Sequence, residues 1–396
     1  MQSIDHRDIG TQQELFFFHK YSPGSCIFLP DGTIILNNLQ RLMREEYKKR
    51  GFLEVSTPQM FNAKLWETSG HLGKYEENMF KISNCSDDMC CMKPMNCPTH
   101  CLIFKHQKRS YRELPLRLAD FGVLHRNELT GTLTGLTRVR KFCQDDAHIF
   151  CTEDQIGSEI NSCFDFIEKI YKIFGFEFSI SLSTRPDAYI GDLELWNKAE
   201  ECLRTNLERW GKPYVVNEGD GAFYGPKIDF YINDSNGKKH QCGTIQLDFN
   251  LPKRFKLKYT NAQDKIDVPV MIHRAVYGSF ERFFGILCEH YAGKFPFWMS
   301  PKQVMIIPIN ETCIEYAKEI KAALYKYYVD IDFSGNTLKK KIVNAEQLRY
   351  NYILVVGEKE IQNKNMNVRF RNVREQKTYS MDQLLSEFKR NQKTFL

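Results

Sequence analysis

Three segments of the chain gather residue types that do chemistry more often than they fill a core. They are Lys93–His100, Arg117–His148 and Val270–Phe283, and between them they hold cysteine, histidine, aspartate and arginine. Arginine suits a phosphorylated substrate, because its planar donor fork matches the oxygens of a phosphate group. The cysteines and histidines lie too far apart along the chain for their spacing alone to indicate a metal site. The segments therefore indicate phosphate chemistry and leave metal chemistry open.

The same segments resemble the signature motifs of the class II aminoacyl-tRNA synthetases. Arg126–Phe142 resembles the second motif, Gly278–Arg282 the third, and Gly51–Pro58 with the helix before it the first. Within the class, three shorter stretches are similar to the threonyl-tRNA synthetases, namely Met95–Pro98, Gln144–His148 and Val270–Arg274. The resemblance covers essentially the whole chain.

The resemblance implies that the carboxylate of L-threonine attacks the α-phosphorus of ATP and that pyrophosphate leaves. A carboxylate with a pKa of about 3.5 is already ionised at pH 7, so this step needs no general base. Catalysis must then come from positioning and from neutralising charge on the α-phosphate. By resemblance, Arg126, Arg282 and Lys227 are catalytic here. The implied ATP-binding residues are Arg126, Glu128, Arg138, Val139, Phe142, Gln241, Thr244, Ser279 and Arg282, with Mg²⁺ accompanying the ATP.

The resemblance also implies one Zn²⁺ per chain, held by Cys97, His148 and His273. The need to distinguish threonine from valine favours a metal. The two amino acids have nearly the same shape, so an apolar pocket prefers one over the other by only about a hundredfold. Zinc with three protein ligands keeps a position open for the substrate hydroxyl, although sulfur and nitrogen ligands also suit cobalt. We expect Asp146 to accept a hydrogen bond from that hydroxyl. The implied threonine pocket consists of Met95, Gln144, Asp146, Tyr224 and Gln246, and we expect Cys85, Cys90 and Cys91 to be unpaired thiols.

Transfer of threonine to the 3′ end of tRNA(Thr) is the second implied step. His71 follows Thr68-Ser-Gly and matches a family loop that faces the tRNA end, so we expect it to act as base or orienter. The last part of the chain resembles an anticodon-binding domain, in which Glu360 and Arg369 match residues that read anticodon bases. Such reading requires unstacked bases approached by hydrogen-bonding side chains.

The local patterns predict elements able to position these residues. Apolar spacing predicts a helix over Asn38–Arg50, and a capping box at Thr152–Gln155 opens another that ends at Gly175. An Asn-Gly turn between Lys227–Ile232 and His240–Phe249 predicts a hairpin. We therefore expect an α+β catalytic domain on an antiparallel sheet flanked by helices over residues 1–299. The alternation of strands and helices after it predicts a small α/β domain with a mixed sheet over residues 300–396.

Composition and charge agree with a globular protein that touches RNA. The chain is 42% apolar and 26% charged, without an apolar run near the roughly 18 residues that span a bilayer. With no signal peptide and an odd total of 13 cysteines, we expect a cytoplasmic protein without a disulfide framework. Residues 301–396 hold 17 basic and 11 acidic residues. Their net charge of +6 equals the net charge of the whole chain. Such an excess is expected where a polyanion binds, and a solvated basic face gives the same pattern.

The family resemblance begins at Asp5, although threonyl enzymes usually carry N-terminal domains, one of which removes mischarged serine. We interpret the sequence as a truncation and expect it to load serine without correcting the error. We expect a homodimer, because the first motif lies at a two-fold interface in this class. Two alternatives stay open: a related class II synthetase for another amino acid, and a synthetase-like protein that binds RNA or a regulator without catalysis.

Overall fold

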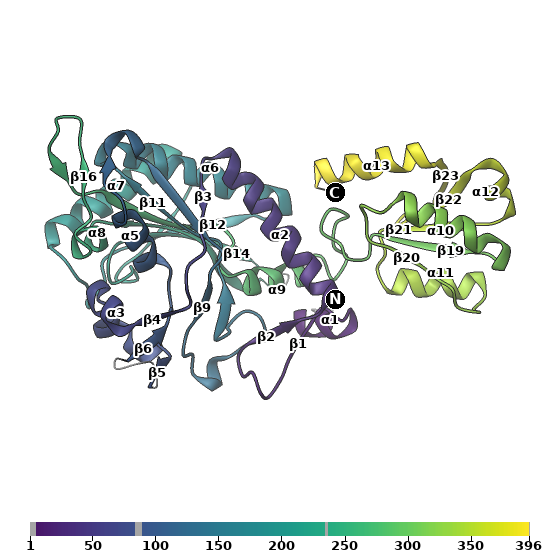
Figure 1. The fold of residues 1–396 in the computed structure, drawn as a ribbon, viewed down its shortest axis with the longest axis horizontal. Coiled ribbons are helices and arrows are strands. Elements are labelled where there is room, and N and C mark those ends of the chain that lie inside the picture. The colour runs from purple at the N-terminus through teal and green to yellow at the C-terminus, as the bar shows by residue number, and fades with distance from the viewer. Residues whose placement is uncertain (1–4, 84–88, 234–236, 396) are drawn as a thin grey trace. The chain divides into compact units, whose positions relative to one another are not determined.

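The computed structural model describes residues 5–83, 89–233 and 237–395, which form two compact units (Figure 1). The large unit consists of Phe18–Cys26 and Leu42–Ile286. The small unit contains the chain from Leu287 onward together with the stretches that end at Phe17 and span Ile27–Arg41. The predicted boundary between residues 299 and 300 stays a prediction.

An eight-stranded sheet forms the centre of the large unit, with the strand order β13-β12-β14-β15-β18-β11-β8-β3. Its strands are β3 (Leu53–Glu54), β8 (Leu116–Asp120), β11 (Asp146–Cys151), β12 (Phe178–Ser183), β13 (Val215–Asn217), β14 (Lys227–Asn233), β15 (Lys239–Asp248) and β18 (Val270–Ala275). The pairings from β12 through β8 are antiparallel, and only the edge strands β13 and β3 join in parallel. The predicted antiparallel sheet is confirmed. Asn236 of the predicted Asn-Gly turn lies outside the described residues.

Helices of the large unit flank this sheet and the short strands beside it (Figure 1). They are α3 (Ala63–Ser69), α4 (His71–Lys74), α5 (Cys97–Lys105), α6 (Ile156–Phe174), α7 (Leu193–Trp210), α8 (Asn250–Arg254) and α9 (Phe280–His290), the last of which runs on into the small unit. Helix α6 follows the capping box of Thr152 and Gln155 and ends at Gly175, whose φ of 72° suits glycine. Its buried side chains, such as Ile160 and Ile167, each contribute about 1.5–3 kcal/mol by leaving water.

Helix α2 is longer than predicted, since it spans Pro30–Lys49 and not Asn38–Arg50. Proline is tolerated in the first helical turn, where its missing N–H would have no partner within the helix, and Asp31 suits the positive helix N-terminus. The apolar spacing missed the first turns, although Ile35 in the missed part is fully buried.

Short strands hold the loops that border the site. They are β4 (Met60–Asn62), β5 (Lys81–Ile82), β6 (Cys90–Met92), β7 (Arg109–Ser110), β9 (Val123–His125), β10 (Lys141–Cys143), β16 (Tyr259–Thr260) and β17 (Ile266–Asp267). Strands β9 and β10 pair in antiparallel fashion, so the two ends of the loop between them, at His125 and Lys141, lie next to each other. The remaining N-terminal elements are α1 (His6–Gln12), β1 (Phe16–Phe18) and β2 (Cys26–Phe28).

The small unit contains a five-stranded sheet of order β20-β19-β21-β22-β23. Its strands are β19 (Val304–Pro308), β20 (Val329–Ile331), β21 (Tyr352–Val356), β22 (Asn365–Phe370) and β23 (Gln376–Ser380). The first two pairings are parallel and the last two antiparallel, so the predicted mixed sheet is confirmed. Its helices are α10 (Ile314–Ala323), α11 (Leu338–Gln347), α12 (Glu358–Asn363) and α13 (Met381–Thr394).

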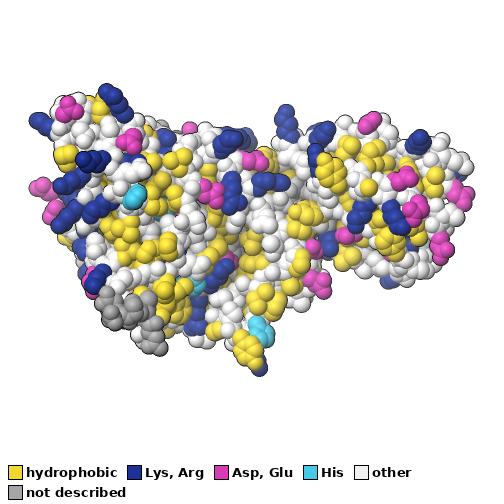
Figure 2. All heavy atoms as spheres, viewed as in Figure 1, with side chains coloured by type: hydrophobic (Ala, Val, Ile, Leu, Met, Phe, Trp, Pro, Cys, Tyr) yellow, Lys and Arg dark blue, Asp and Glu magenta, His cyan; other side chains and the backbone are white. Residues whose placement is uncertain are grey.

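Basic side chains also gather on the large unit, near α5, α8 and β16 (Figure 2). The exposed lysines of this region are Lys105, Lys108, Lys253, Lys256 and Lys258. The pairing of β7 with β16 brings these two stretches of chain together. Residues 1–300 carry no net charge in total, so this local excess arises from folding and not from composition.

Two further expectations concern the cysteines and the membrane. Cys90 is disulfide-bonded, so the expectation of a free thiol is wrong at that position, whereas Cys91 is a free, buried thiol. Cys85 lies outside the described residues. No helix in the described part of the chain has the length and the apolar content needed to cross a bilayer.

Candidate active site

A cysteine and two histidines meet on the central sheet of the large unit. His148 on β11 and His273 on β18 are direct cross-strand neighbours, and Cys97 is the first residue of α5. The potential ligand atoms of these three buried residues all lie within 4.8 Å of one another. Nε2 of His148 is 3.1 Å from Nδ1 of His273. A sulfur and two nitrogens at this separation fit the donor set of a zinc ion with three protein ligands.

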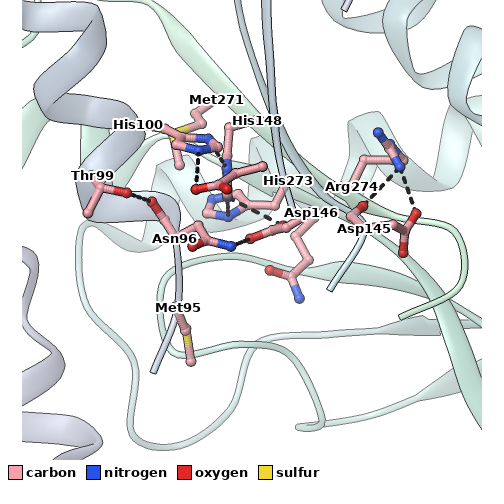
Figure 3. Close-up of polar contacts among 12 residues, drawn as sticks. Met95, Asn96, Thr99, His100, Asp145, Asp146, His148, Met271, His273 and Arg274 are labelled. Atoms are coloured by element: carbon pink, nitrogen blue, oxygen red, sulfur yellow. Dashed lines mark hydrogen bonds and ion pairs between the residues drawn. The ribbon is translucent and has the colours of Figure 1, made fainter. Parts of the chain in front are cut away.

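Each histidine of this metal cluster has a partner for its other ring nitrogen. Nε2 of His273 contacts Oδ2 of Asp248 at 3.0 Å, and Nδ1 of His148 contacts Nδ1 of His100 at 2.7 Å (Figure 3). Burial lowers the pKa of His148, so its ring is neutral at pH 7 and retains a lone pair for a metal. Burial also raises the pKa of the Cys97 thiol, so a metal ion must displace its proton. Sequence reasoning missed both partners, because neither lies in a family motif position assigned to the site.

A cavity of about 380 Å³ opens beside the metal cluster. Its walls include all five residues predicted for the amino-acid pocket, Met95, Gln144, Asp146, Tyr224 and Gln246, together with Cys97, His148 and His273. Oδ2 of Asp146 accepts a hydrogen bond of 3.0 Å from Nδ2 of Asn96, which leaves its second oxygen for another donor (Figure 3). The hydroxyl of Tyr224 donates to Oε1 of Gln246 at 2.5 Å, and the Tyr224 ring stacks on His273. The cavity is thus polar at its metal end and fixed in shape by its own contacts.

A second cavity, of about 370 Å³, contains the residues predicted to bind the nucleotide. Its lining includes Arg126, Glu128, Arg138, Val139, Phe142, Gln241, Thr244, Ser279 and Arg282. Backbone carbonyls hold the Arg282 guanidinium, since Nη1 donates to Gln241 at 2.7 Å and Nε donates to Thr137 at 3.1 Å. Arg138 pairs with Glu128 at 2.9 Å. Three guanidinium groups around one cavity suit a polyphosphate, whose oxygens accept paired hydrogen bonds.

The two cavities share part of their walls. Arg126, Gln144, Thr244 and Gln246 line both. The guanidinium of Arg126 lies 5.0 Å from the centre of the Phe142 ring, which holds it at this junction. A ligand in one cavity therefore lies within reach of a ligand in the other, as a reaction between the two requires.

Lys227 lines the first cavity and depends on a buried carboxylate, Asp229, that sequence reasoning missed. Oδ2 of Asp229 lies 2.8 Å from Nζ of Lys227. Oδ1 of the same residue accepts hydrogen bonds from Gln241 at 2.6 Å and from Thr244 at 3.0 Å. Asp229 thus orients three predicted site residues. The alternation of side chains along β14, which places residues 227 and 229 on one face, is the signal that identifies it.

Asp145 links the strand that carries the first cavity to the turn that carries the second. It lies between Gln144 and Asp146, and its carboxylate accepts hydrogen bonds from the backbone N–H groups of Val276, Tyr277 and Gly278. Nη1 of the fully buried Arg274 donates to the same carboxylate at 3.0 Å. The carboxylate of Asp145 therefore holds the backbone turn that precedes Ser279, and Arg274 balances its charge.

His71 is fully buried. It is not one of the described residues that line the two cavities. Its Nδ1 contacts Oγ of Ser69 at 2.8 Å, and its Nε2 contacts Sδ of Met95 at 3.2 Å. Burial lowers its pKa to about 3, so the ring is neutral at pH 7. In this arrangement His71 orients Met95, a wall of the amino-acid cavity, and the base role stays a prediction.

The two predicted anticodon residues lie in the small unit. Arg369 on β22 lines a cavity of about 440 Å³ that is rich in basic side chains, including Lys294, Arg349, Arg371 and Arg374. Oε2 of Glu360 accepts a hydrogen bond of 3.0 Å from the backbone of Gly357, where α12 begins. A basic cavity suits a phosphate backbone or a base edge, whereas the role of Glu360 in reading bases stays a prediction.

Comparison with known proteins agrees with this geometry. The model of the tRNA synthetase class II core domain (G, H, P, S and T) matches residues 80–291, and that of an anticodon binding domain matches residues 303–391. The cytoplasmic threonine–tRNA ligase of Saccharomyces cerevisiae is 53% identical over 394 residues, which cover 97% of this chain and 54% of the yeast protein. The chain spans about half the length of the curated relatives it matches.

Solved structures resemble this chain over nearly its whole length. A crystal structure described as the RNA binding domain of threonyl-tRNA synthetase from Cryptosporidium parvum superposes with a TM-score of 0.96 at 48% identity, over 98% of both chains. A putative threonyl-tRNA synthetase from Aeropyrum pernix gives a TM-score of 0.84 at 27% identity, over 99% of this chain and 96% of its own. The core model matches more than half of the chain and contains the complete metal cluster, so this protein belongs to the class II aminoacyl-tRNA synthetases.

Proposed function

We propose that this protein is a threonine–tRNA ligase, which activates L-threonine with ATP and transfers it to tRNA(Thr). The observation that carries the proposal is the pair of cavities that share Arg126, Gln144, Thr244 and Gln246. One holds a cysteine–histidine cluster beside a buried carboxylate, and the other holds three arginines. This combination suits a small amino acid with a polar side chain on one side and a nucleotide on the other.

In the first step, a carboxylate oxygen of threonine forms a bond to the α-phosphorus of ATP as the bond to the leaving pyrophosphate breaks. Arg126 lies where the cavities meet, so it would hold the attacking carboxylate and the α-phosphate together. Arg282 and Arg138 would bind the remaining phosphates, with Mg²⁺ accompanying them. Lys227, oriented by Asp229, would add a positive charge beside the reacting groups. Positioning and charge neutralisation are sufficient because the attacking carboxylate is already ionised.

Cys97, His148 and His273 would hold one zinc ion per chain. When bound there, zinc supplies an open coordination position for the polar groups of the amino acid. Asp146 would then accept a hydrogen bond from the threonine hydroxyl through the oxygen that Asn96 leaves free. Valine offers no such donor and would leave this oxygen of the buried carboxylate unpaired. An unpaired buried oxygen rejects valine far more strongly than a difference in side-chain shape does. Serine carries the same polar groups and would be accepted.

In the second step, the 3′-terminal hydroxyl of tRNA attacks the activated carbonyl, an ester bond forms and AMP leaves. The small unit would bind the anticodon, with Arg369 in its basic cavity and Glu360 nearby in sequence as the proposed reading residues. His71 would act as base or orienter for the transfer. We propose that the protein works in the cytoplasm, as the names of its relatives state for those proteins, and as a homodimer.

Amino-acid-dependent exchange of pyrophosphate into ATP tests the first step. We expect exchange with threonine and with serine but not with valine, and we expect a zinc chelator to abolish it and added zinc to restore it. Exchange that depends on another amino acid, such as proline, would instead support a different class II synthetase. Absence of exchange in a folded chain that binds RNA would support the non-catalytic alternative.

A matched pair of cysteine variants tests the metal cluster. Cys97→Ala removes the sulfur ligand and should lose both zinc and threonine-dependent exchange. Cys202→Ala removes a partly buried free thiol on α7 and should keep both. For the transfer step, His71→Ala should slow single-turnover formation of threonyl-tRNA, and an unchanged rate would contradict a role for His71 in transfer.

A further inference from the structure

His100 contacts His148 of the metal cluster. In the proposed function it binds neither the metal nor a substrate. It is the fourth residue of α5, three positions after Cys97, and it is fully buried. Its Nδ1 lies 2.7 Å from Nδ1 of His148 (Figure 3). The two rings meet edge to face with their centres 4.7 Å apart.

A hydrogen bond between two imidazole nitrogens requires one N–H and one lone pair. Nε2 of His148 faces His273 and Cys97, so it is the nitrogen that would bind a metal. The proton of the neutral His148 ring must then lie on Nδ1, which donates to Nδ1 of His100. His100 accepts this bond only when its own proton lies on Nε2.

The surroundings of His100 favour that tautomer. Nε2 of His100 has no hydrogen-bond partner among the described residues, and Oδ2 of Asp120 lies 3.8 Å from it. The same oxygen accepts a hydrogen bond of 2.6 Å from Thr57, whose hydroxyl in turn accepts from the fully buried Lys93 at 2.6 Å. A proton on Nε2 points toward a carboxylate that Thr57 and Lys93 hold in place, whereas a lone pair there would face a negative charge.

The other metal-binding histidine is oriented in a different way. Nε2 of His273 contacts the carboxylate of Asp248 directly at 3.0 Å, whereas the imidazole of His100 lies between Nδ1 of His148 and the carboxylate of Asp120. Partners of this kind fix the tautomer and the ring plane of a ligand, and their removal typically weakens metal binding by about 10- to 100-fold.

We infer that His100 is a positioning residue for the metal, which fixes the tautomer and orientation of His148 through a chain of contacts from Lys93 and Asp120. This inference rests on the proposed metal site. It assigns a role to Lys93, which heads the first of the three chemically unusual segments and which neither cavity uses.

The test compares His100→Leu, which removes the acceptor, with His100→Asn, whose side-chain oxygen takes the place of Nδ1. His106→Leu is the control, because His106 is an exposed histidine at the end of the same helix. The readouts are the Kd for zinc, measured by competition with a chromophoric chelator, and the thermal midpoint of each metal-free chain.

We expect the Kd to rise about 10- to 100-fold in His100→Leu, to stay within about threefold of the starting value in His100→Asn, and to be unchanged in His106→Leu. The metal-free midpoints of the two His100 variants should agree with each other. Equal zinc affinity in His100→Leu and the unaltered chain would overturn the inference, as would equal losses in His100→Leu and His100→Asn. If the unaltered chain binds no zinc, both this inference and the proposed metal site fail. If it binds zinc and His100→Leu does too, only this inference fails.

Discussion

The substitution Asp145→Asn has the largest expected effect, because this one carboxylate connects the strand beside the first cavity to the turn beside the second. It accepts four hydrogen bonds of 2.8–3.0 Å, three from backbone N–H groups of residues 276–278 and one from Arg274. An asparagine retains one acceptor oxygen but places an NH₂ group where the second oxygen was. That group faces the N–H of Val276 and the guanidinium of Arg274, which are donors themselves.

The expected loss follows from these contacts. A buried backbone N–H left without an acceptor costs about 1–3 kcal/mol. A buried charge left without its partner costs about 3–5 kcal/mol. We therefore expect Asp145→Asn to lower the free energy of unfolding of the large unit by roughly 4–8 kcal/mol, which is comparable to the total stability of many domains. Because Ser279 follows the turn that Asp145 holds, ATP binding should weaken as well.

Urea unfolding followed by circular dichroism measures the loss, and Asp154→Asn, an exposed aspartate, is the control that should change by less than about 0.5 kcal/mol. A second variant isolates the ion pair. Arg274 lies over the rings of Tyr47 and Phe52 at 5.1 Å and 5.0 Å, so Arg274→Met replaces the charge with an apolar side chain in an aromatic setting. Asp145→Asn combined with Arg274→Met should be at least about 2 kcal/mol more stable than Asp145→Asn alone, since no charge is left unpaired. A loss below 1 kcal/mol in Asp145→Asn, or no recovery in the double variant, would refute the reasoning.

Three further predictions concern single side chains. Asp229→Asn should lower the rate of threonine-dependent pyrophosphate exchange by up to about a hundredfold, because it releases Lys227, Gln241 and Thr244; zinc content should stay the same, and the exposed Asp187→Asn is its control. Tyr224→Phe leaves Oε1 of Gln246 without its donor, so the KM for threonine should rise roughly tenfold, or about 1.4 kcal/mol, with a smaller change in kcat; an unchanged KM would show that this contact does not shape the pocket. His71→Gln should flatten the loss of stability in acid. The folded pKa of His71 is about 3 and the unfolded value about 6.5, so below pH 6.5 the unfolded chain takes up a proton that the folded chain does not. Stability from His71 is therefore present above pH 6.5 and falls by about 1.4 kcal/mol per pH unit toward pH 3; equal slopes for His71→Gln and the unaltered chain in urea titrations at pH 5 and 6 would contradict this.

The sequence determined the elements whose causes are local. Helix α6 is bounded by a capping box and by a glycine with positive φ, both of which act within a few residues, and its predicted position is confirmed. The strands β14 and β15 were predicted from the Asn-Gly turn between them, and their antiparallel pairing confirms this prediction. The first turns of α2 were missed, because Pro30 to Thr33 show no apolar period and Ile34 to Leu36 form a short continuous apolar run, which periodicity alone does not assign to a helix.

The predicted residues of the nucleotide and amino-acid pockets line two cavities that meet, although their roles in binding stay predictions. Family motifs identify side chains that face a substrate, since those positions have recognisable neighbours along the chain. They do not identify the side chains behind them. Asp229, Asp248 and His100 each orient a site residue. Asp229 could be identified only from its place on the same strand face as Lys227, and the contacts of Asp248 and His100 appear only in the folded chain.

Only the tertiary structure decided which of these residues meet. His148 and His273 are 125 positions apart and become neighbours through the register of β11 with β18, in which a shift by one residue would turn one of the two rings to the opposite face of the sheet. The same is true of charge: residues 1–300 carry no net charge, yet the pairing of β7 with β16 gathers lysines on one part of the large unit. Short-range interactions specify a helix or a turn within a few residues, whereas contacts between distant segments depend on how the whole chain packs, and a metal cluster or a basic patch is made of such contacts.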